Sequence, residues 1–181
     1  MREQKASTRG WGRVPVFRLE LRGPAHLPHP LGSPVPVVVT LHNTSAHRVW
    51  AAGVLDGSED GVRYPHYEPA VLLEGRTVSP RRQPEDPLVG PLRPADFRQL
   101  EPGEAFDPTG PGYLPLTTFT TFTPRRPGTY LYTLTLSTLS ADPEEWLGRF
   151  GQGEERATVL GLVARVPRER TVSPPLPIEV R

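Results

Sequence analysis

The chain has 181 residues, enough for one domain with a substantial core, and its formal net charge is only +1. That charge excludes a global field able to recruit nucleic acid or an anionic membrane, and the lack of cysteine excludes disulfides, thiolate metal sites and cysteine nucleophiles. The 24 prolines and 17 glycines, set against several cleanly alternating runs, indicate a β-rich domain with long loops.

Residues 1–12 are polar and charged, which predicts a flexible N-terminal arm in front of a single domain at 13–181. This segment has no apolar stretch of the kind found in signal peptides or transmembrane helices. We therefore expect the protein to be cytoplasmic.

Alternating apolar residues predict a first strand at 14–21 and a second at 35–41. A polar turn at 43–46 and an apolar run at 48–55 then predict a third strand, which carries Trp50 and returns beside the second as a hairpin. A hairpin of this kind is typical of the start of a β-sandwich.

The middle of the chain is predicted to be mostly loop. Residues 56–69 form an acidic and then aromatic loop, and residues 79–94 hold five prolines, which favours a long surface excursion. Short strands are expected at 71–74 and from Phe106. A threonine-rich strand is expected at 116–123, where the odd spacing of its two phenylalanines requires either a bulge or burial on both sides.

The clearest strand is 127–136, where two tyrosines and two leucines alternate with threonines and one further leucine. Residues 142–147 predict the only helix, with Asp142 as N-cap, Pro143 in the first turn and Glu145 closing a capping box. Strands at 157–166 and 177–180 complete a set of roughly eight or nine, the number expected of an antiparallel sandwich.

Three motifs carry a resemblance. They are the run Val-Val-Val-Thr-Leu-His-Asn-Thr-Ser at 37–45, Leu-Glu-Pro-Gly-Glu at 100–104 and Pro-Gly-Thr-Tyr at 127–130. Together they are similar to those of bacterial single-domain immunoglobulin-like proteins, a group that also resembles intracellular proteinase-inhibitor folds. The resemblance implies an all-β fold, an immunoglobulin-like antiparallel β-sandwich with long Pro/Gly-rich loops and one short helix. Tyr130 would then act as a tyrosine corner that ties a loop to the sheet.

Metal and catalytic patterns are incomplete. The loop at 56–61 has calcium-like spacing but lacks the bidentate glutamate at the twelfth place, so a solvated acidic turn is the competing interpretation. His42, His47 and His66 would supply three zinc ligands without a fourth. The chain has neither a nucleophile elbow nor a phosphate-binding glycine loop. We therefore expect no enzyme activity and no cofactor.

Two apolar or aromatic groups remain as candidate binding residues. Trp146, Leu147 and Phe150 lie on or after the short helix and either seal one end of the core or anchor a partner. Tyr64, His66 and Tyr67 form the second group, in the aromatic part of the loop at 56–69.

The sequence therefore predicts a non-catalytic protein–protein interaction module, similar to an inhibitor or an adaptor, that binds another protein through loops or a sheet edge. We expect neither nucleic acid nor a membrane as partner. The alternatives are small-ligand or carbohydrate binding by Trp50, Tyr64, Tyr67 and Trp146, and a metal-dependent hydrolase built on the three histidines.

Overall fold

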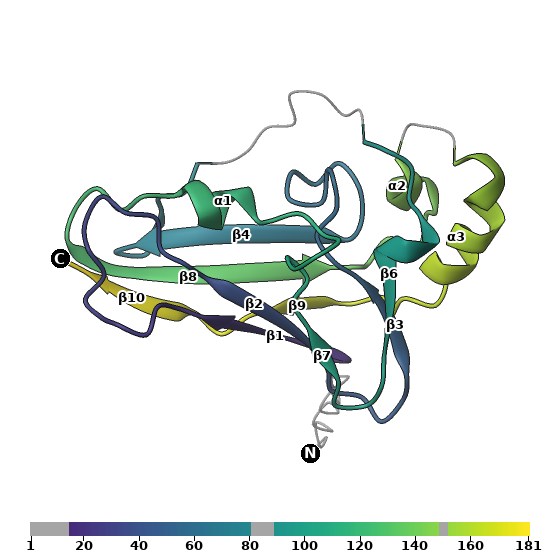
Figure 1. Cartoon of the computed structure of the whole chain (residues 1–181), viewed down its shortest axis with the longest axis horizontal. Coiled ribbons are helices and arrows are strands. Elements are labelled where there is room, and N and C mark those ends of the chain that lie inside the picture. Colours follow the sequence, from purple (N-terminus) through teal and green to yellow (C-terminus); the bar gives the residue numbers. More distant parts are fainter. Residues whose placement is uncertain (1–14, 81–88, 149–151) are drawn as a thin grey trace, which may run out of the picture.

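The computed structural model describes residues 15–80, 89–148 and 152–181 of the chain. Antiparallel strands make up most of the regular structure there, as the sequence predicted, and Figure 1 shows them with a few short helices. The predicted arm at 1–12 lies outside the described residues. Within them, no helix has both the length and the apolar character that a membrane crossing requires.

The first sheet has the strand order β1-β2-β7. Its members are β1 (Phe17–Arg22), β2 (Val38–Asn43) and β7 (Ala105–Phe106). The register pairs Leu19 with Leu41, and both side chains are buried. One face of this sheet is therefore apolar and needs a second layer to cover it.

The second sheet is built around the strand that showed the clearest alternation in the sequence. Its order is β10-β8-β4-β5, with β9 also paired to β8. The members are β4 (His66–Leu73), β5 (Arg76–Thr77), β8 (Gly128–Ser137), β9 (Arg170–Val172) and β10 (Leu176–Val180). In β8 the predicted face is buried, with Tyr130, Tyr132, Leu134 and Leu136 all at most 2% exposed.

Strands β3 (Val49–Ala52) and β6 (Phe97–Leu100) pair with each other, so the predicted hairpin between the second and third strands is wrong. The turn after β2 explains why. Asn43 is 1% exposed, and its side-chain amide donates to the carbonyl oxygens of His47, Leu100 and Glu101. These bonds hold the chain beside the 100–104 turn, and β3 continues along β6.

The buried side chains form two clusters. The first lies between the inner faces of the two sheets and contains residues of β1, β2, β4, β8 and β10. The second cluster lies beside β3 and β6 and includes Leu92, Trp146, Val159 and Val163. Figure 1 shows α2 and α3 gathered at this end of the molecule, whereas α1 lies over β4.

The predicted strand at 116–123 is instead α1 (Thr117–Thr121), which corrects the expectation of a single helix. The carboxylate of Glu59 accepts the N–H groups of Thr117 and Thr118 at 2.7 and 2.8 Å, and so satisfies two donors of the first turn. Phe119 and Phe122, spaced by three, now share one face and approach the ring of Tyr132. No bulge is needed.

The predicted strand at 157–166 is also wrong, because this segment contains α3 (Arg156–Val163). Val159 and Val163 lie four residues apart and are both buried, which is a helical spacing. Their packing onto the second cluster outweighs the β-propensity of valine. Two 3-10 turns, η1 (Pro94–Asp96) and η2 (Gly153–Glu155), precede β6 and α3.

The helix predicted at 142–147 is confirmed as α2 (Glu144–Leu147), and it ends at Gly148 with φ +76°. Its start differs in detail. The carboxylate of Asp142 accepts the N–H of Glu144 at 3.0 Å, but the carboxylate of Glu145 bonds the hydroxyl of Ser140 rather than closing a box onto Asp142.

Candidate functional site

The two groups of predicted binding residues meet in space. Tyr64 stacks on His66 with ring centroids 3.8 Å apart, and it also stacks on Trp146 at 5.7 Å. The backbone N–H of Tyr64 donates to the carbonyl oxygen of Glu145 in α2. The predicted aromatic loop therefore packs directly onto the predicted helix. His66 and Tyr67 belong to β4 and not to a loop.

Most of these residues are core rather than surface. Trp146, Leu147 and Tyr67 are each 0% exposed, while Tyr64 and His66 are half-buried. The Trp146 ring lies between Tyr64 and the guanidinium of Arg168, which is 4.8 Å from its centroid. These positions favour the sealing role over the anchor. Phe150 lies outside the described residues.

The carbohydrate alternative loses its support for the same reason. Two of its four aromatic residues, Tyr67 and Trp146, have no exposed surface. The polar group of each side chain already forms a hydrogen bond within the protein. The Tyr67 hydroxyl donates to the carbonyl oxygen of Ala52 at 2.7 Å, and burial raises the pKa of this phenol. The indole N–H of Trp146 donates to the carbonyl oxygen of Ser140.

Several residues of the metal hypotheses are engaged in structural contacts, while the side chain of His47 is exposed. His42 bonds the carboxylate of Glu20 at 3.1 Å, and Ser58 and Glu59 hold the backbone of Leu55 and of α1. Among the described residues, no group of three histidine or acidic side chains is arranged to hold a metal ion.

A cleft that the sequence did not predict lies beside the second cluster. It has a volume of about 370 Å³ and is formed by three loops, at 54–63, 90–96 and 112–114. Its charged lining consists of Asp56, Arg63, Arg93 and Asp96, with Val54, Leu55 and Leu114 as apolar walls. The size falls in the range of about 300–1,000 Å³ typical of ligand pockets.

Arg63 is the unusual residue of this cleft. It is only 4% exposed, and one guanidinium nitrogen, Nη1, donates to the carbonyl oxygen of Gly90 at 2.5 Å. Its Nε is buried without a hydrogen-bond partner, and no carboxylate among the described residues forms an ion pair with it. Desolvation lowers the pKa of Arg63, although the nearby charges of Asp56 and Asp96 act against the shift. Arginine keeps its charge under such conditions, so the cleft contains a positive charge with very little hydration.

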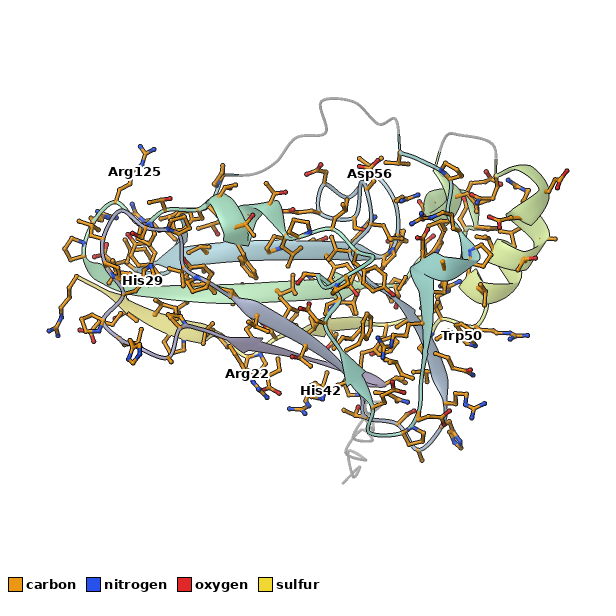
Figure 2. The ribbon with its side chains drawn as sticks, viewed as in Figure 1. Arg22, His29, His42, Trp50, Asp56 and Arg125 are labelled. Carbon is orange, nitrogen blue, oxygen red and sulfur yellow. The ribbon has the colours of Figure 1, made fainter. Side chains whose placement is uncertain are left out.

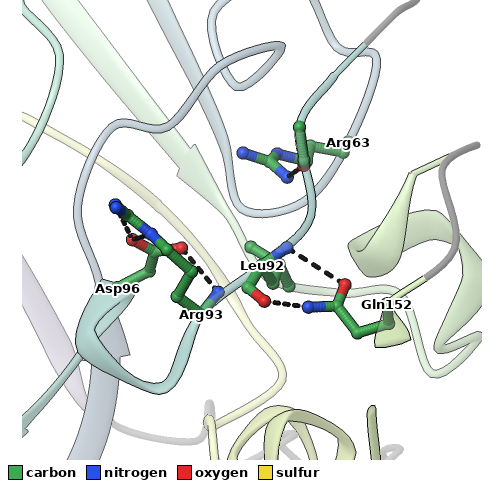
Figure 3. Close-up of polar contacts among 6 residues, drawn as sticks. Arg63, Leu92, Arg93, Asp96 and Gln152 are labelled. Atoms are coloured by element: carbon green, nitrogen blue, oxygen red, sulfur yellow. Dashed lines mark hydrogen bonds and ion pairs between the residues drawn. The ribbon is translucent and has the colours of Figure 1, made fainter. Parts of the chain in front are cut away.

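A side-chain clamp fixes the loop that Arg63 contacts. The backbone N–H of Leu92 donates to Oε1 of Gln152 at 3.0 Å, and the amide nitrogen of Gln152 donates back to the Leu92 carbonyl oxygen. Gln152 is 6% exposed, so it satisfies two buried backbone groups as a neighbouring strand would. Figure 3 shows this clamp, Arg63 and the Arg93–Asp96 pair arranged around the segment at 90–93.

Arg93 and Asp96 form a self-contained pair at the rim. Nη2 of Arg93 donates to Oδ1 of Asp96 at 2.6 Å, and the Arg93 backbone N–H donates to Oδ2 at 2.8 Å. This partner raises the pKa of Arg93. Both oxygens of Asp96 are thereby engaged, although its side chain is 3% exposed. Asp96 is therefore directly paired with Arg93, whereas Arg63 is influenced by Asp56 and Asp96 without forming an ion pair with either of them.

The cleft is suited to hold an anionic group. A carboxylate placed there would meet a poorly hydrated, preorganised guanidinium flanked by apolar walls. Sequence reasoning missed this site because the burial of Arg63 depends on three loops that are remote in the chain. Comparison of the chain with protein-family models and with curated proteins finds no significant match.

Proposed function

We propose that this chain is a non-catalytic protein–protein interaction module with an immunoglobulin-like β-sandwich fold, working in the cytoplasm without a cofactor. It binds a partner protein through the loops around the Arg63 cleft, which receives an acidic side chain of that partner.

The three motifs that carried the resemblance support this fold, because each forms a structural junction. Asn43 joins the first motif to the second, and the N–H of Gly103 donates to the Asn43 carbonyl oxygen. In the third motif, the Tyr130 hydroxyl donates to the carbonyl oxygen of Arg126 at 2.9 Å, as a tyrosine corner would. Two antiparallel sheets that share one core also fit the sandwich.

Binding through loops is favoured over strand addition at a sheet edge. At the start of β1, the N–H groups of Val16 and Phe17 already donate to the carboxylate of Glu169, at 2.8 and 2.7 Å. The terminal strands β5 and β7 are two residues long each. His29 bonds the backbone of Glu179 and Arg181 beside β10. These contacts and short lengths limit the free backbone at the start of β1, at β5 and β7, and beside β10.

The observation that carries the proposal is the buried Arg63 without a carboxylate partner among the described residues. A buried charge that lacks a partner lowers the stability of the fold. An acidic group from a second protein would supply the missing charge and recover part of that cost.

The test compares wild-type protein with Arg63→Met, which keeps the length of the side chain and removes its charge. Arginine Nε–Hε resonances are followed by NMR while acetyl-glutamate, and then a short acidic peptide, is added. We expect the Arg63 resonance to shift in the wild type. In parallel, capture of proteins from native lysate by the immobilised chain should be lost in Arg63→Met.

The matched control is Arg22→Met, an exposed arginine on β1 whose ion pair with Glu20 is far from the cleft in sequence. It should capture the same proteins as wild type. Equal capture by wild type and Arg63→Met, together with an unmoved Arg63 resonance, would contradict the proposal. Because Met is apolar, we also expect Arg63→Met to be at least as stable as wild type, with a gain of about 1 kcal/mol in the free energy of unfolding.

A further inference from the structure

A second cleft lies at the other end of the β4–β8 ladder, where β4 ends and β8 begins. Its volume is about 490 Å³. The lining residues are Leu73, Val78, Pro80, Thr121, Phe122, Thr123, Arg125, Arg126 and Tyr130. Figure 2 shows Arg125 well apart from Asp56, which lines the Arg63 cleft, and the two clefts share no lining residue.

The floor of the cleft is aromatic and fixed by packing. The half-buried ring of Phe122 lies 5.9 Å from the ring of Tyr130 and 6.4 Å from that of Tyr132. Leu73 pairs with Tyr130 across the ladder and is buried beside it. An apolar ligand body placed here would cover the exposed part of Phe122 and Val78.

The backbone that carries the two arginines is held at two points. The carbonyl oxygen of Pro124 accepts the N–H of Gly32 at 3.1 Å, and the carbonyl oxygen of Arg126 accepts the Tyr130 hydroxyl at 2.9 Å. Gly128 is needed in the same turn, because at its φ of +149° an added Cβ would lie 3.0 Å from Leu73. The turn thus presents Arg125 and Arg126 from a preorganised backbone.

The charge of the cleft is unbalanced. No acidic residue of the described part of the chain lines it, and neither Arg125 nor Arg126 forms an ion pair with any described residue. Many other exposed arginines do have an acidic partner: Arg18 and Arg22 with Glu20, Arg48 with Glu101, Arg98 with Glu104, Arg156 with Glu144, and Arg181 with Glu179. Two guanidinium groups without an acidic partner in the described ranges therefore border an apolar floor.

We infer that this cleft binds a soluble amphiphile that carries one carboxylate on an apolar body, such as a medium-chain fatty acid. The carboxylate pairs with Arg125 and Arg126, and the apolar body lies on Phe122 and Val78. This inference does not depend on the proposed function, because the two clefts share no lining residue.

Decanoate below its micellar concentration is the probe, and 1-decanol is its uncharged counterpart. We expect decanoate to bind the full-length wild type in a calorimetric titration, with NMR contacts from its methyl end to Phe122 and Val78. Binding should weaken by about tenfold or more in the Arg125→Gln/Arg126→Gln double variant, since bonds to a charged group are lost. Decanol should bind wild type and the double variant equally weakly.

The control is Arg18→Gln/Arg22→Gln, which removes the same charge from the exposed face of β1 and should bind decanoate as wild type does. Failure of wild type to bind decanoate, equal binding of decanoate and decanol, or an unaffected double variant would each overturn the inference. Vesicles of phosphatidylglycerol form a separate arm. Binding to them that depends on Arg125 and Arg126, without decanoate binding, would assign these arginines to a lipid surface and refute the free-ligand proposal.

Discussion

At the scale of single residues, the side chain of Asn43 fixes the path of the chain after β2, where the sequence had predicted a hairpin. Its amide nitrogen donates to three carbonyl oxygens, at 2.8, 3.1 and 3.0 Å, and its own oxygen accepts the N–H and hydroxyl of Ser45. Its bonds to His47 and Ser45 close the turn after β2, and those to Leu100 and Glu101 join this turn to the 100–104 turn.

Asn43→Asp is therefore expected to be strongly destabilising. The substitution places a carboxylate oxygen against three carbonyl oxygens, and we expect a loss of about 3 kcal/mol or more in the free energy of unfolding, measured by urea denaturation. Ser45→Ala, which removes a single hydroxyl from the same turn, is the control and should cost about 1 kcal/mol. An Asp variant as stable as the Ala variant would contradict this account of the turn.

His66 links stability to pH. Burial lowers the pKa of this half-buried imidazole, while the carboxylates of Glu68 and Glu145 act in the opposite direction. Because the pKa is lower in the folded state than the 6.5 of a free imidazole, the stabilisation is complete above that pH and is lost as the pH falls through the folded pKa.

We expect the melting temperature of wild type to fall on acidification from about pH 7 to about pH 5 more steeply than that of His66→Gln. The comparison uses the slope with pH, because the variant also loses the stack on Tyr64 and starts from a different level. His47→Gln, which removes an exposed imidazole, should keep the slope of wild type. Identical slopes for wild type and His66→Gln would refute the assignment.

At the scale of elements, the Gln152 clamp decides whether the loop at 90–93 stays attached to the helical end of the molecule. Gln152→Met keeps the shape but leaves the N–H and carbonyl of buried Leu92 without partners. We expect a loss of about 2–4 kcal/mol in chemical denaturation and weaker binding at the Arg63 cleft. The exposed Gln99→Met on β6 is the control, and should change stability by less than about 0.5 kcal/mol. Equal stability of the two variants would show that the clamp is dispensable.

Elements with simple alternation were predictable, and those that depend on remote partners were not. The face of β8 and the position of α2 follow from local pattern, since a strand alternates and a helix start has characteristic residues. In contrast, α1 depends on Glu59, which lies 58 residues before Thr117. The valines and threonine of the α3 segment favour a strand prediction. The helix becomes evident only once Val159 and Val163 are seen to be buried on the same side.

The candidate site was harder to predict than the fold. Aromatic residues in an apparent loop suggested exposure, but Tyr67 and Trp146 prove to be core. Arg63, in contrast, carries no pattern that distinguishes it from a surface arginine. Its burial results from three loops that come together in the folded chain, and residue spacing along the sequence does not predict such a contact.

At the scale of the whole molecule, the strands around β8 should be the last to open. Along its length β8 is flanked by β4 on one side, and by β10 and then β9 on the other. The short helix α3 has no such ladder, and half of its residues are exposed. Local opening follows the number of buried contacts that must break together.

We therefore expect the amides of Tyr132 and Leu134 to exchange with deuterium most slowly, and those of α3 at least about tenfold faster. Peptide-resolved hydrogen exchange under native conditions measures both in one experiment. Val39 in β2, which lies across the same core, provides an internal reference for the first sheet. If α3 is protected as strongly as β8, then the two hydrophobic clusters unfold as one unit.

The carboxylate of Glu169 has a consequence for self-association. By binding the N–H of Phe17, the first residue of β1, and that of Val16 just before it, this carboxylate occupies donors that an added strand from an identical chain could use. It also links a residue just before β9 to the opposite sheet, 153 positions away from Val16. One acidic side chain thereby caps the start of this edge strand and links the two sheets.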